Sequence, residues 1–239
     1  MSHFLHFIKL IKYIKYYYSV LLRNWFNKKD SYSQHGEDLL VEKILGCKVN
    51  SFIDIGANDG VLFSNTFKFA KYGAAGLCIE PSPRSFKKLR LNHLFHSKIA
   101  CLNYAISNRD GKIYFIEDGY EETLSRVSNS SEEGSKEIQC CTFNTVLNKY
   151  PNFKDIDLLS VDVEGHELQV FEGLDFNLHK PEVIVVELLD LSVKKLEIKN
   201  LNIENLFNTE LYKFLTSKNY ILVNCIYSDL IFINKDFRD

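Results

Sequence analysis

Residues 51–60, SFIDIGANDG, constrain the fold of this chain more than any other segment. The run at residues 52–55 is mostly apolar and includes β-branched side chains, and Gly56 ends it, which is typical of a buried parallel strand followed by a tight turn. Gly56 and Gly60 bracket a turn where the backbone can approach a ligand, and a helix after Ser64 would point its first N–H groups at the same place. The pattern predicts a ligand crevice at the carboxyl end of this strand.

The acidic residues around this turn indicate which ligand it holds. A dinucleotide fingerprint, G-x-G-x-x-G, places a pyrophosphate on its glycines, whereas here Asp54 and Asp59 flank the turn between Gly56 and Gly60. These carboxylates would repel a pyrophosphate but attract an ammonium or a sulfonium group. Glu80 ends the next apolar run, where an acid can accept the hydroxyl protons of a ribose. The spacing therefore favours S-adenosylmethionine over a dinucleotide, the alternative being that Asp54 caps a turn and Glu80 is a solvated loop carboxylate.

Length and composition indicate one domain with an N-terminal extension. The chain has 239 residues, of which 46% are hydrophobic and 25% charged, enough for one α/β domain and too few for two. Residues 1–30 carry six Lys and Arg against one Asp, a net charge of +5, so the remaining residues, 31–239, carry −7 of the total of −2. No clustered basic face is apparent in the domain, so we expect no nucleic-acid partner.

The cysteines indicate the compartment. All six lack a C-x-x-C pair, and several lie within apolar runs, so they are interpreted as small buried side chains in a reducing environment. We therefore expect a cytoplasmic protein.

The N-terminal extension, residues 1–30, is predicted to be a basic amphipathic helical arm. Its lysines interrupt any long apolar run, so it resembles neither a spanning helix nor a signal peptide. Two interpretations remain open: residues 1–26 contact the inner face of a membrane peripherally, or they pack on the domain or on a second subunit in a homodimer. The predicted apolar face consists of Phe7, Ile11, Ile14, Tyr18, Leu21, Leu22 and Trp25.

The rest of the chain alternates predicted helices and strands, as expected for a parallel sheet with helices on both faces. A three-layer α/β sandwich with a mostly parallel seven-stranded sheet and an antiparallel edge follows. We expect a mobile loop at residues 118–136, which are rich in Ser and Glu. The predicted helices are 33–45, 64–72, 83–95, 166–173 and 204–217, and the predicted strands are 51–55, 76–80, 99–105, 112–117, 138–143, 157–162, 182–188, 220–226 and 229–233.

A second polar constellation, DVEGHE at residues 162–167, follows the strand predicted at 157–162. Ligands of open α/β sheets bind at the carboxyl ends of strands, so this segment should face the same crevice. Asp162 could orient a hydroxyl acceptor or hold a cation, and His166 could take the hydroxyl proton, the alternative for His166 being an exposed first helical turn. We predict Asp162, Glu164 and His166 as the catalytic residues.

Three carboxylates fall at strand ends: Asp162, Glu164 and Glu187. Such oxygen ligands would suit Mg²⁺ or Ca²⁺ rather than zinc. We nevertheless expect that the reaction requires no metal.

These segments together resemble the FkbM family of S-adenosylmethionine-dependent methyltransferases over about residues 31–190. The resemblance implies the class I methyltransferase fold, which is Rossmann-like, and O-methylation, often of a sugar hydroxyl in a polysaccharide or natural product. The segments that carry it are SQHGED at 33–38, FIDIGANDG at 52–60, IEPSP at 79–83, NYAIS at 103–107, DLLSVDVEGHE at 157–167 and VIVVE at 183–187.

The resemblance also assigns roles by position. Glu80 would hold the ribose of the cofactor, and Asn103 to Ala105 would border its adenine. Gln34, His35 and Asp38 would close over the cofactor or the acceptor, unless they only cap a helix. The residues expected to line the cofactor are Asp54, Gly56, Ala57, Asn58 and Gly60.

The function expected from the sequence is O-methylation of a sugar hydroxyl in a cell-surface or lipid-linked glycan. One alternative is O-methylation of a diffusible natural product. The other is a non-catalytic interaction module with the same fold, which is disfavoured because all the residues expected at the site are present together: Asp54, Gly56, Gly60, Glu80 and Asp162.

Overall fold

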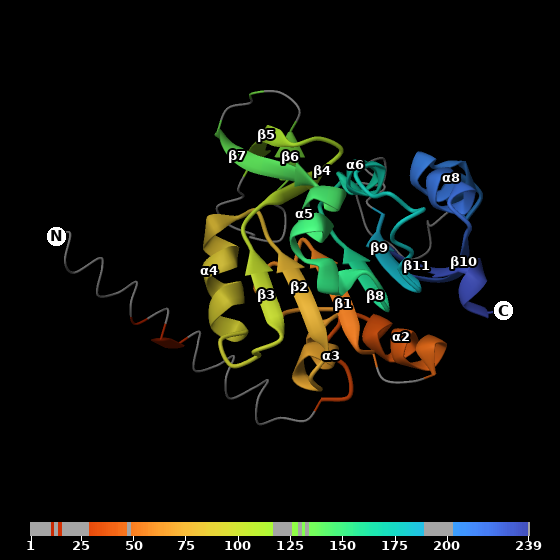
Figure 1. Ribbon diagram of the computed structural model, residues 1–239, viewed down its shortest axis with the longest axis horizontal. Coiled ribbons are helices and arrows are strands. Elements are labelled where there is room, and N and C mark those ends of the chain that lie inside the picture. The colour runs from red at the N-terminus through yellow and green to blue at the C-terminus, as the bar shows by residue number, and fades with distance from the viewer. Residues whose placement is uncertain are drawn as a thin grey trace.

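The strand order of the main sheet places the carboxyl ends of its central strands together (Figure 1). From one edge to the other, its seven strands are β10 (Tyr220–Ile226), β11 (Asp229–Asn234), β9 (Val183–Glu187), β8 (Leu158–Val161), β1 (Ser51–Ile55), β2 (Ala75–Ile79) and β3 (Ile99–Leu102). Strands β9, β8, β1, β2 and β3 are parallel, and β11 is antiparallel to both of its neighbours. The predicted seven-stranded sheet, with its antiparallel pair at one edge, is confirmed.

The structure is a computed structural model that describes residues 11, 14–15, 29–46, 49–116, 126–128, 131, 134–188 and 203–238. Almost all of the predicted amphipathic arm and most of the loop predicted at 118–136 lie outside the described residues. Within the described part of the chain, no helix is both long enough and apolar enough to cross a membrane.

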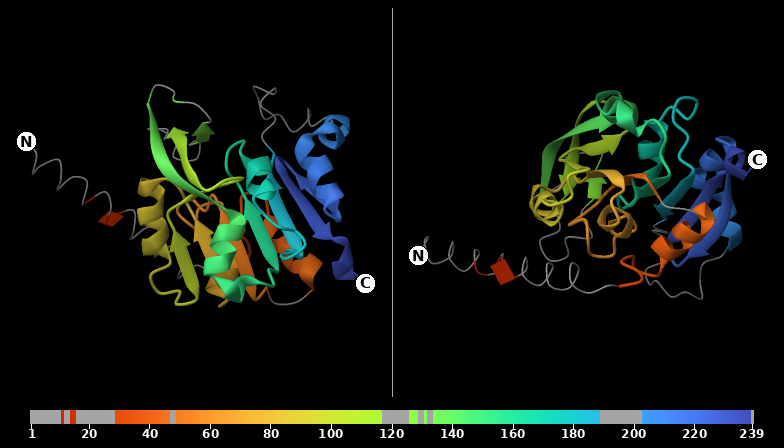
Figure 2. Two further views of the ribbon diagram at one scale, coloured as in Figure 1. Left: turned by 45° about the horizontal axis from the view of Figure 1, so that its top comes forward. Right: turned by 60° about the horizontal axis from the view of Figure 1, so that its bottom comes forward.

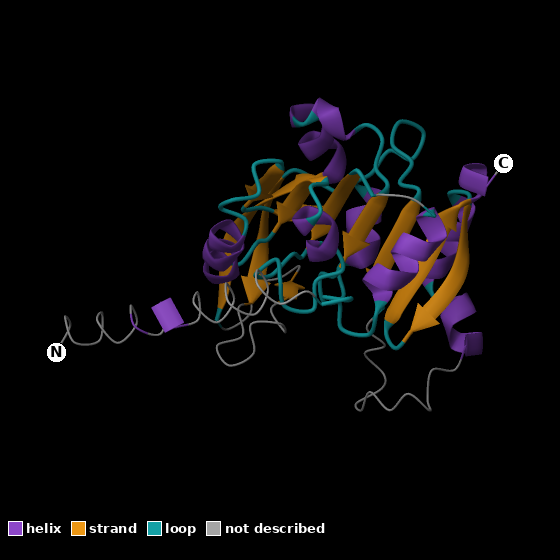
Figure 3. Cartoon of the chain, turned by 90° about the horizontal axis from the view of Figure 1, so that it is seen from below, coloured by secondary structure: helices purple, strands orange, loops and turns teal. Residues whose placement is uncertain are grey.

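Alternation along each strand divides the core between the two faces of the sheet. In β1, Ile53 and Ile55 lie in one hydrophobic cluster and Phe52 lies in the other. Helices α5 (Phe143–Lys149), α6 (Glu167–Glu172), α7 (Ile203–Asn208) and α8 (Glu210–Ser217) contribute to the first cluster. Helices α2 (Glu37–Leu45), α3 (Phe67–Lys71) and α4 (Pro83–Asn92) contribute to the second. Helices therefore cover both faces, and the three-layer sandwich is confirmed (Figures 2 and 3).

A second, four-stranded sheet was not predicted. Its strands are ordered β4 (Ala105–Ser107), β7 (Ser135–Thr142), β5 (Gly111–Ile116) and β6 (Arg126–Ser128). The segments predicted at 112–117 and 138–143 are strands, but they belong to this small sheet, which lies above the carboxyl ends of β1, β2 and β3 (Figure 1). The small sheet therefore forms a wall over the edge where the site is expected.

The strand predicted at 99–105 is present but ends at Leu102, where the chain leaves the main sheet. The side-chain amide of Asn103 donates to the carbonyl oxygens of Glu80 and Pro81, at 2.7 and 3.0 Å. This side chain, rather than backbone pairing, continues the contact with the neighbouring segment. The chain then enters β4 in the small sheet.

Several predicted helix boundaries also differ from the structure. Helix α2 begins at Glu37, after Gly36 in the left-handed region, so Ser33 does not begin it. The helix predicted at 204–217 is two helices, α7 and α8, because the hydroxyl of Thr209 accepts a hydrogen bond from the N–H of Tyr212 and starts a new helix. Helix α5 and two 3₁₀ turns, Pro151–Phe153 and Lys235–Arg238, were not predicted.

The contact between Gly76 of β2 and the Phe52 ring of β1 can be tested by substitution. Gly76 lies opposite Phe52, and a Cβ atom at residue 76 would overlap the buried Phe52 ring. Gly76→Ala should therefore lower the free energy of unfolding by about 1–3 kcal/mol, because the ring cannot move without disturbing a packed core. Denaturant unfolding measures this loss. Phe52→Leu in the same chain should recover part of it, and strictly additive losses in the double variant would contradict the predicted overlap.

Candidate active site

One cavity lies at the carboxyl ends of β1, β2 and β8, beneath the small sheet. It brings together six of the residues predicted for the site, whereas five others do not line it. The predicted residues that line it are Gly56, Asn58, Glu80, Ala105, Asp162 and Glu164, and those that do not are Asp54, Ala57, Gly60, Asn103 and His166.

The turn after β1 holds three strand ends together. Gly56 has a φ of +87°, and a Cβ atom there would overlap the carbonyl oxygen of Asp162, so only glycine fits. The N–H groups of Gly56 and Ala57 donate to the carbonyl of Ile79, at 2.9 and 3.1 Å, and the N–H of Asp162 donates to the carbonyl of Ile55 at 2.9 Å. The floor of the cavity is therefore backbone held in one arrangement.

Glu80 is a buried, oriented carboxylate on this floor. Its side chain is only 6% exposed, which rules out a solvated loop position. The N–H of Asn58 donates to Oε2 at 2.8 Å, and the N–H of Ser82 donates to Oε1 at 2.7 Å. These bonds hold the carboxylate at the edge of the cavity, where the sequence predicts ribose recognition.

An apolar wall also lines the cavity. Tyr104 lies in the segment expected to border the adenine, whereas Ile106, Phe115 and Val127 were missed in sequence because they belong to the unpredicted small sheet. The wall includes Ile79, Tyr104, Ile106, Phe115 and Val127.

The two carboxylates around the β1 turn have internal partners. The hydroxyl of Thr66 donates to Oδ2 of Asp54 at 2.6 Å, on the face of the sheet covered by α3. Burial raises the pKa of Asp54 to about 6. Oδ1 of Asp59 accepts from the N–H groups of Val61 and Leu62, at 2.9 and 2.8 Å, so Asp59 stabilises the turn itself.

His166 does not reach the cavity, so its predicted role as the base has no support in this geometry. Its ring is 6% exposed, and its Nε2 lies 3.0 Å from the hydroxyl oxygen of Ser107. Burial, together with the charge of Arg109, lowers the pKa of His166 to about 4. The side chain joins β4 to the start of α6, and sequence spacing alone could not show which way the ring points.

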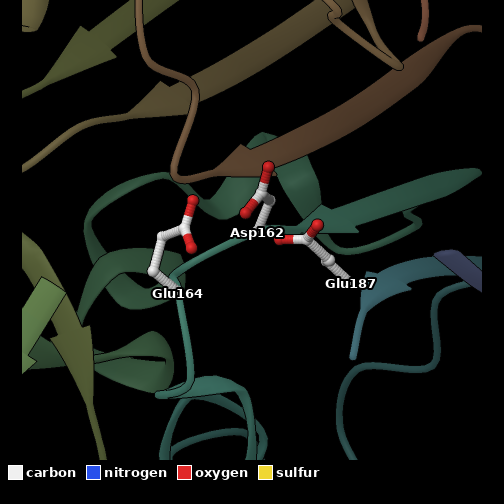
Figure 4. A group of neighbouring side chains, drawn as sticks. All are labelled: Asp162, Glu164 and Glu187. Carbon is white, nitrogen blue, oxygen red and sulfur yellow. The ribbon is translucent and has the colours of Figure 1, made fainter. Parts of the chain in front are cut away.

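Three carboxylates, Asp162, Glu164 and Glu187, converge where β8 and β9 end, and the first two line the cavity (Figure 4). One oxygen from each lies within 4.8 Å of the others, and we call these three residues the carboxylate cluster. Burial and the charge of Glu187 raise the pKa of Glu164 to about 8, and burial with the same neighbour raises the pKa of Asp162 well above its usual range. Asp162 has exposed surface and is one of the residues that line the cavity.

None of the residues of segment SQHGED, 33–38, lines the cavity. Asp38 accepts hydrogen bonds from Ser31 and from the N–H of Tyr32, so it fixes the chain before α2. The ring of His35 stacks on Tyr227, with centroids 3.6 Å apart. Tyr227 lies in the turn between β10 and β11, next to Ser228, whose hydroxyl donates to Glu187 at 3.0 Å.

The elevated pKa of Asp54 predicts a pH-dependent stability. The pKa is about 6 in the folded chain against an ordinary 3.8, so this contribution to stability is complete below pH 3.8 and is lost as the pH rises through 6. Above pH 6 the buried charge costs up to about 3 kcal/mol. Asp54→Asn removes the charge and keeps an acceptor for Thr66, so its Tm should exceed that of the wild type at pH 7.5 and approach it near pH 4. An equal or lower Tm for the variant at pH 7.5 would contradict this assignment.

A family model and a curated relative match this chain. The family model of the methyltransferase FkbM domain matches residues 54–222, which is more than half of the chain. A curated relative, the 2-O-methyltransferase NoeI of Sinorhizobium fredii (strain NBRC 101917 / NGR234), is 28% identical over 155 residues, which cover 58% of this chain and 63% of NoeI.

Two solved structures are weakly similar to this chain. The methyltransferase FkbM from Methylobacillus flagellatus KT is 13% identical with a TM-score of 0.47, and the match covers 78% of this chain and 44% of that one. An O-methyltransferase from Bacillus cereus in complex with SAH is 11% identical with a TM-score of 0.46, over 92% of this chain and 90% of the other. The chain thus spans less than two thirds of NoeI and of the Methylobacillus protein. The family match and the strand order together show that this chain belongs to the FkbM methyltransferase family and has the class I methyltransferase fold.

Proposed function

We propose that the protein uses S-adenosylmethionine to methylate a hydroxyl group, and that the acceptor is a sugar of a cell-surface or lipid-linked glycan. The observation that carries the proposal is one cavity lined by Glu80, which follows β2, and by Asp162 and Glu164, which follow β8 on the other side of β1. The first side suits a ribose and the second suits a hydroxyl acceptor. The two reacting partners would thus meet in the same enclosed space.

The chemistry of the first side fits the nucleoside half of the cofactor. A carboxylate held by two backbone N–H groups can accept hydrogen bonds from ribose hydroxyls without reorienting. The apolar wall, with Tyr104, Ile106 and Phe115 among its members, offers a surface for a flat purine. Ala105 lies in this wall region, as the resemblance implies, while Asn103 supports it from outside by its bonds to Glu80 and Pro81.

The chemistry of the second side fits a hydroxyl. S-adenosylmethionine supplies an electrophilic methyl group on a positively charged sulfur. Asp162 and Glu164 line the cavity and can accept a hydrogen bond from an acceptor hydroxyl, orient it and receive its proton. A positively charged ligand on this side would favour the ionised form of both carboxyl groups, whose pKa values are raised by burial and by neighbouring carboxylates.

Two lines support a sugar acceptor. The relative NoeI is described as a 2-O-methyltransferase, and the resemblance to the FkbM family implies sugar hydroxyls among its acceptors. The basic, aromatic pattern of residues 1–26 would keep the enzyme near a lipid-linked acceptor at the inner face of a membrane.

Ribose recognition by Glu80 is tested by ligand affinity. Glu80→Ala should raise the Kd for S-adenosylmethionine and S-adenosylhomocysteine by about 5- to 150-fold, because ribose hydroxyls lose a partner whose hydrogen bonds are worth about 1–3 kcal/mol. Calorimetric titration measures both ligands, with NAD as a third. Glu210→Ala, an exposed glutamate on α8, is the control and should bind as the wild type does. Unchanged affinity in Glu80→Ala would remove Glu80 from the site, and binding of NAD alone would overturn the choice of cofactor.

The acceptor side is tested by turnover. Asp162→Asn should lower kcat for methyl transfer to a saccharide acceptor by about 10²- to 10⁴-fold, because the acceptor loses a proton-accepting group, while the Kd for S-adenosylhomocysteine, which carries no sulfonium charge, changes little. Transfer of labelled methyl groups to a panel of oligosaccharides measures the loss. The exposed Asp155, before β8, gives the matched control Asp155→Asn. Full turnover in Asp162→Asn would contradict the assigned role.

A further inference from the structure

The turn between β8 and α6 contains two consecutive residues in the left-handed region of backbone conformation. Glu164 has a φ of +56° and Gly165 a φ of +95°. Glycine adopts such values readily, whereas a glutamate there is strained and persists only where its surroundings hold it. Glu164 lines the cavity, and its carboxylate lies near that of Asp162 (Figure 4). The strained residue is therefore one that the proposed function uses.

The two ends of this turn are fixed by the elements around it. At its start, the N–H of Asp162 donates to the carbonyl of Ile55 at 2.9 Å. At its end, Nε2 of His166 lies 3.0 Å from the hydroxyl oxygen of Ser107 in β4, a strand that contributes to the cavity lining. A Cβ atom at Gly173, just after α6, would overlap the carbonyl oxygen of Ser107, so α6 and β4 are in close contact. These contacts fix the ends of the turn but not its middle.

The middle of the turn is held by Glu167, the first residue of α6. Glu167 is only 5% exposed, and its Oε1 accepts from the N–H of Gly165 at 2.9 Å. Burial raises the pKa of Glu167, while hydrogen bonds from the backbone N–H groups of Gly165, of Glu167 itself and of Val163 oppose that rise. The carboxylate thus interacts with the backbone on both sides of Glu164.

A simpler role for Glu167 would be to place negative charge at the N-terminus of a helix. That role requires no burial, and Glu210, the first residue of α8, is exposed. Glu167 is instead buried and bonds to Gly165, which lies outside the helix. Burying a carboxylate is costly unless hydrogen bonds compensate it. The position of Glu167 therefore favours a role in the turn over a role in the helix alone.

We propose that Glu167 is a positioning residue for the acceptor side of the cavity: its carboxylate holds the backbone around Glu164 in the left-handed conformation and thereby keeps the Glu164 side chain at the cavity. The inference rests on the proposed function, in which Glu164 orients the acceptor hydroxyl. Glu167 is not among the residues that line the cavity, so it acts through Glu164. Because methyl transfer depends on alignment, a small displacement of Glu164 is enough to slow it.

Turnover tests whether Glu167 acts through Glu164. Glu167→Met fills a similar space without a hydrogen-bond acceptor. It should lower kcat for methyl transfer to an oligosaccharide acceptor by about 10- to 100-fold, while the Kd for S-adenosylhomocysteine changes by less than about twofold. Adding Glu167→Met to Glu164→Ala should cause no further loss of kcat.

Two variants serve as controls for this experiment. Glu167→Gln keeps a side-chain oxygen for the N–H of Gly165 and should recover part of kcat. Glu210→Met makes the same change at the first residue of another helix and should turn over as the wild type does.

The outcomes separate this inference from the proposed function. Full kcat in Glu167→Met, or losses that add in the double variant, would overturn the role of Glu167 and leave the proposed function standing. No transfer by the wild type to any oligosaccharide would reject the proposed acceptor instead. Thermal unfolding, which needs no acceptor, then decides on Glu167.

Thermal unfolding tests whether Glu167 holds the left-handed conformation. Glu164→Gly and Glu164→Ala remove the same carboxylate, but glycine alone relieves the strain. With Glu167 present, Glu164→Gly should therefore have the higher Tm. In the Glu167→Met background the turn can relax, so the difference should shrink or change sign, because glycine gains more freedom on unfolding.

An equal difference between the two position-164 variants in both backgrounds would contradict the role of Glu167. An equal Tm for the two variants in the wild-type background would contradict the proposal even if Glu167→Met did not fold.

Discussion

The close approach of the turn after β1 to the end of β8 is the constraint on which the site depends. Gly56 leaves no room for a side chain against the carbonyl of Asp162, and its N–H and that of Ala57 bind the end of β2. Both sides of the cavity are attached to this junction: Glu80 follows β2, and Asp162 follows β8. Cofactor-binding and acceptor-binding groups are therefore positioned by the same few backbone hydrogen bonds. Rigid backbone is well suited to this task because methyl transfer depends mainly on alignment.

Electrostatics divides the site into two parts with different demands. Glu80 is satisfied by backbone N–H groups and is ready to accept hydroxyls. The carboxylate cluster differs from Glu80 because its members repel one another and form no ion pair with a Lys or Arg among the described residues. A positively charged ligand such as a sulfonium would favour the ionised form of these carboxyl groups.

Much of this site could be predicted from the sequence because parallel strands end at a common edge. Gly56, Glu80 and Asp162 each follow an apolar run. Because these runs are neighbouring parallel strands, their carboxyl ends lie at the same edge of the sheet. The same reasoning applies only in part to Asp54. Its side chain lies on the face of the sheet covered by α3, where it accepts a hydrogen bond from Thr66. The position of the His166 ring could not be predicted, because local spacing does not determine whether a ring at a helix start faces the cavity or Ser107. The remaining differences are long-range: the small sheet above the site depends on a break after β3, and the pairing of Asp229 with Glu187 depends on a register between distant strands.

The most direct test of the account is an experimental structure of the protein in complex with S-adenosylhomocysteine. The account predicts the ribose hydroxyls on Glu80, the adenine against the wall that includes Tyr104 and Phe115, and the sulfur directed toward Asp162 and Glu164. A ligand bound elsewhere, or bound in this cavity with its ribose away from Glu80, would contradict the central claim that this cavity joins cofactor and acceptor.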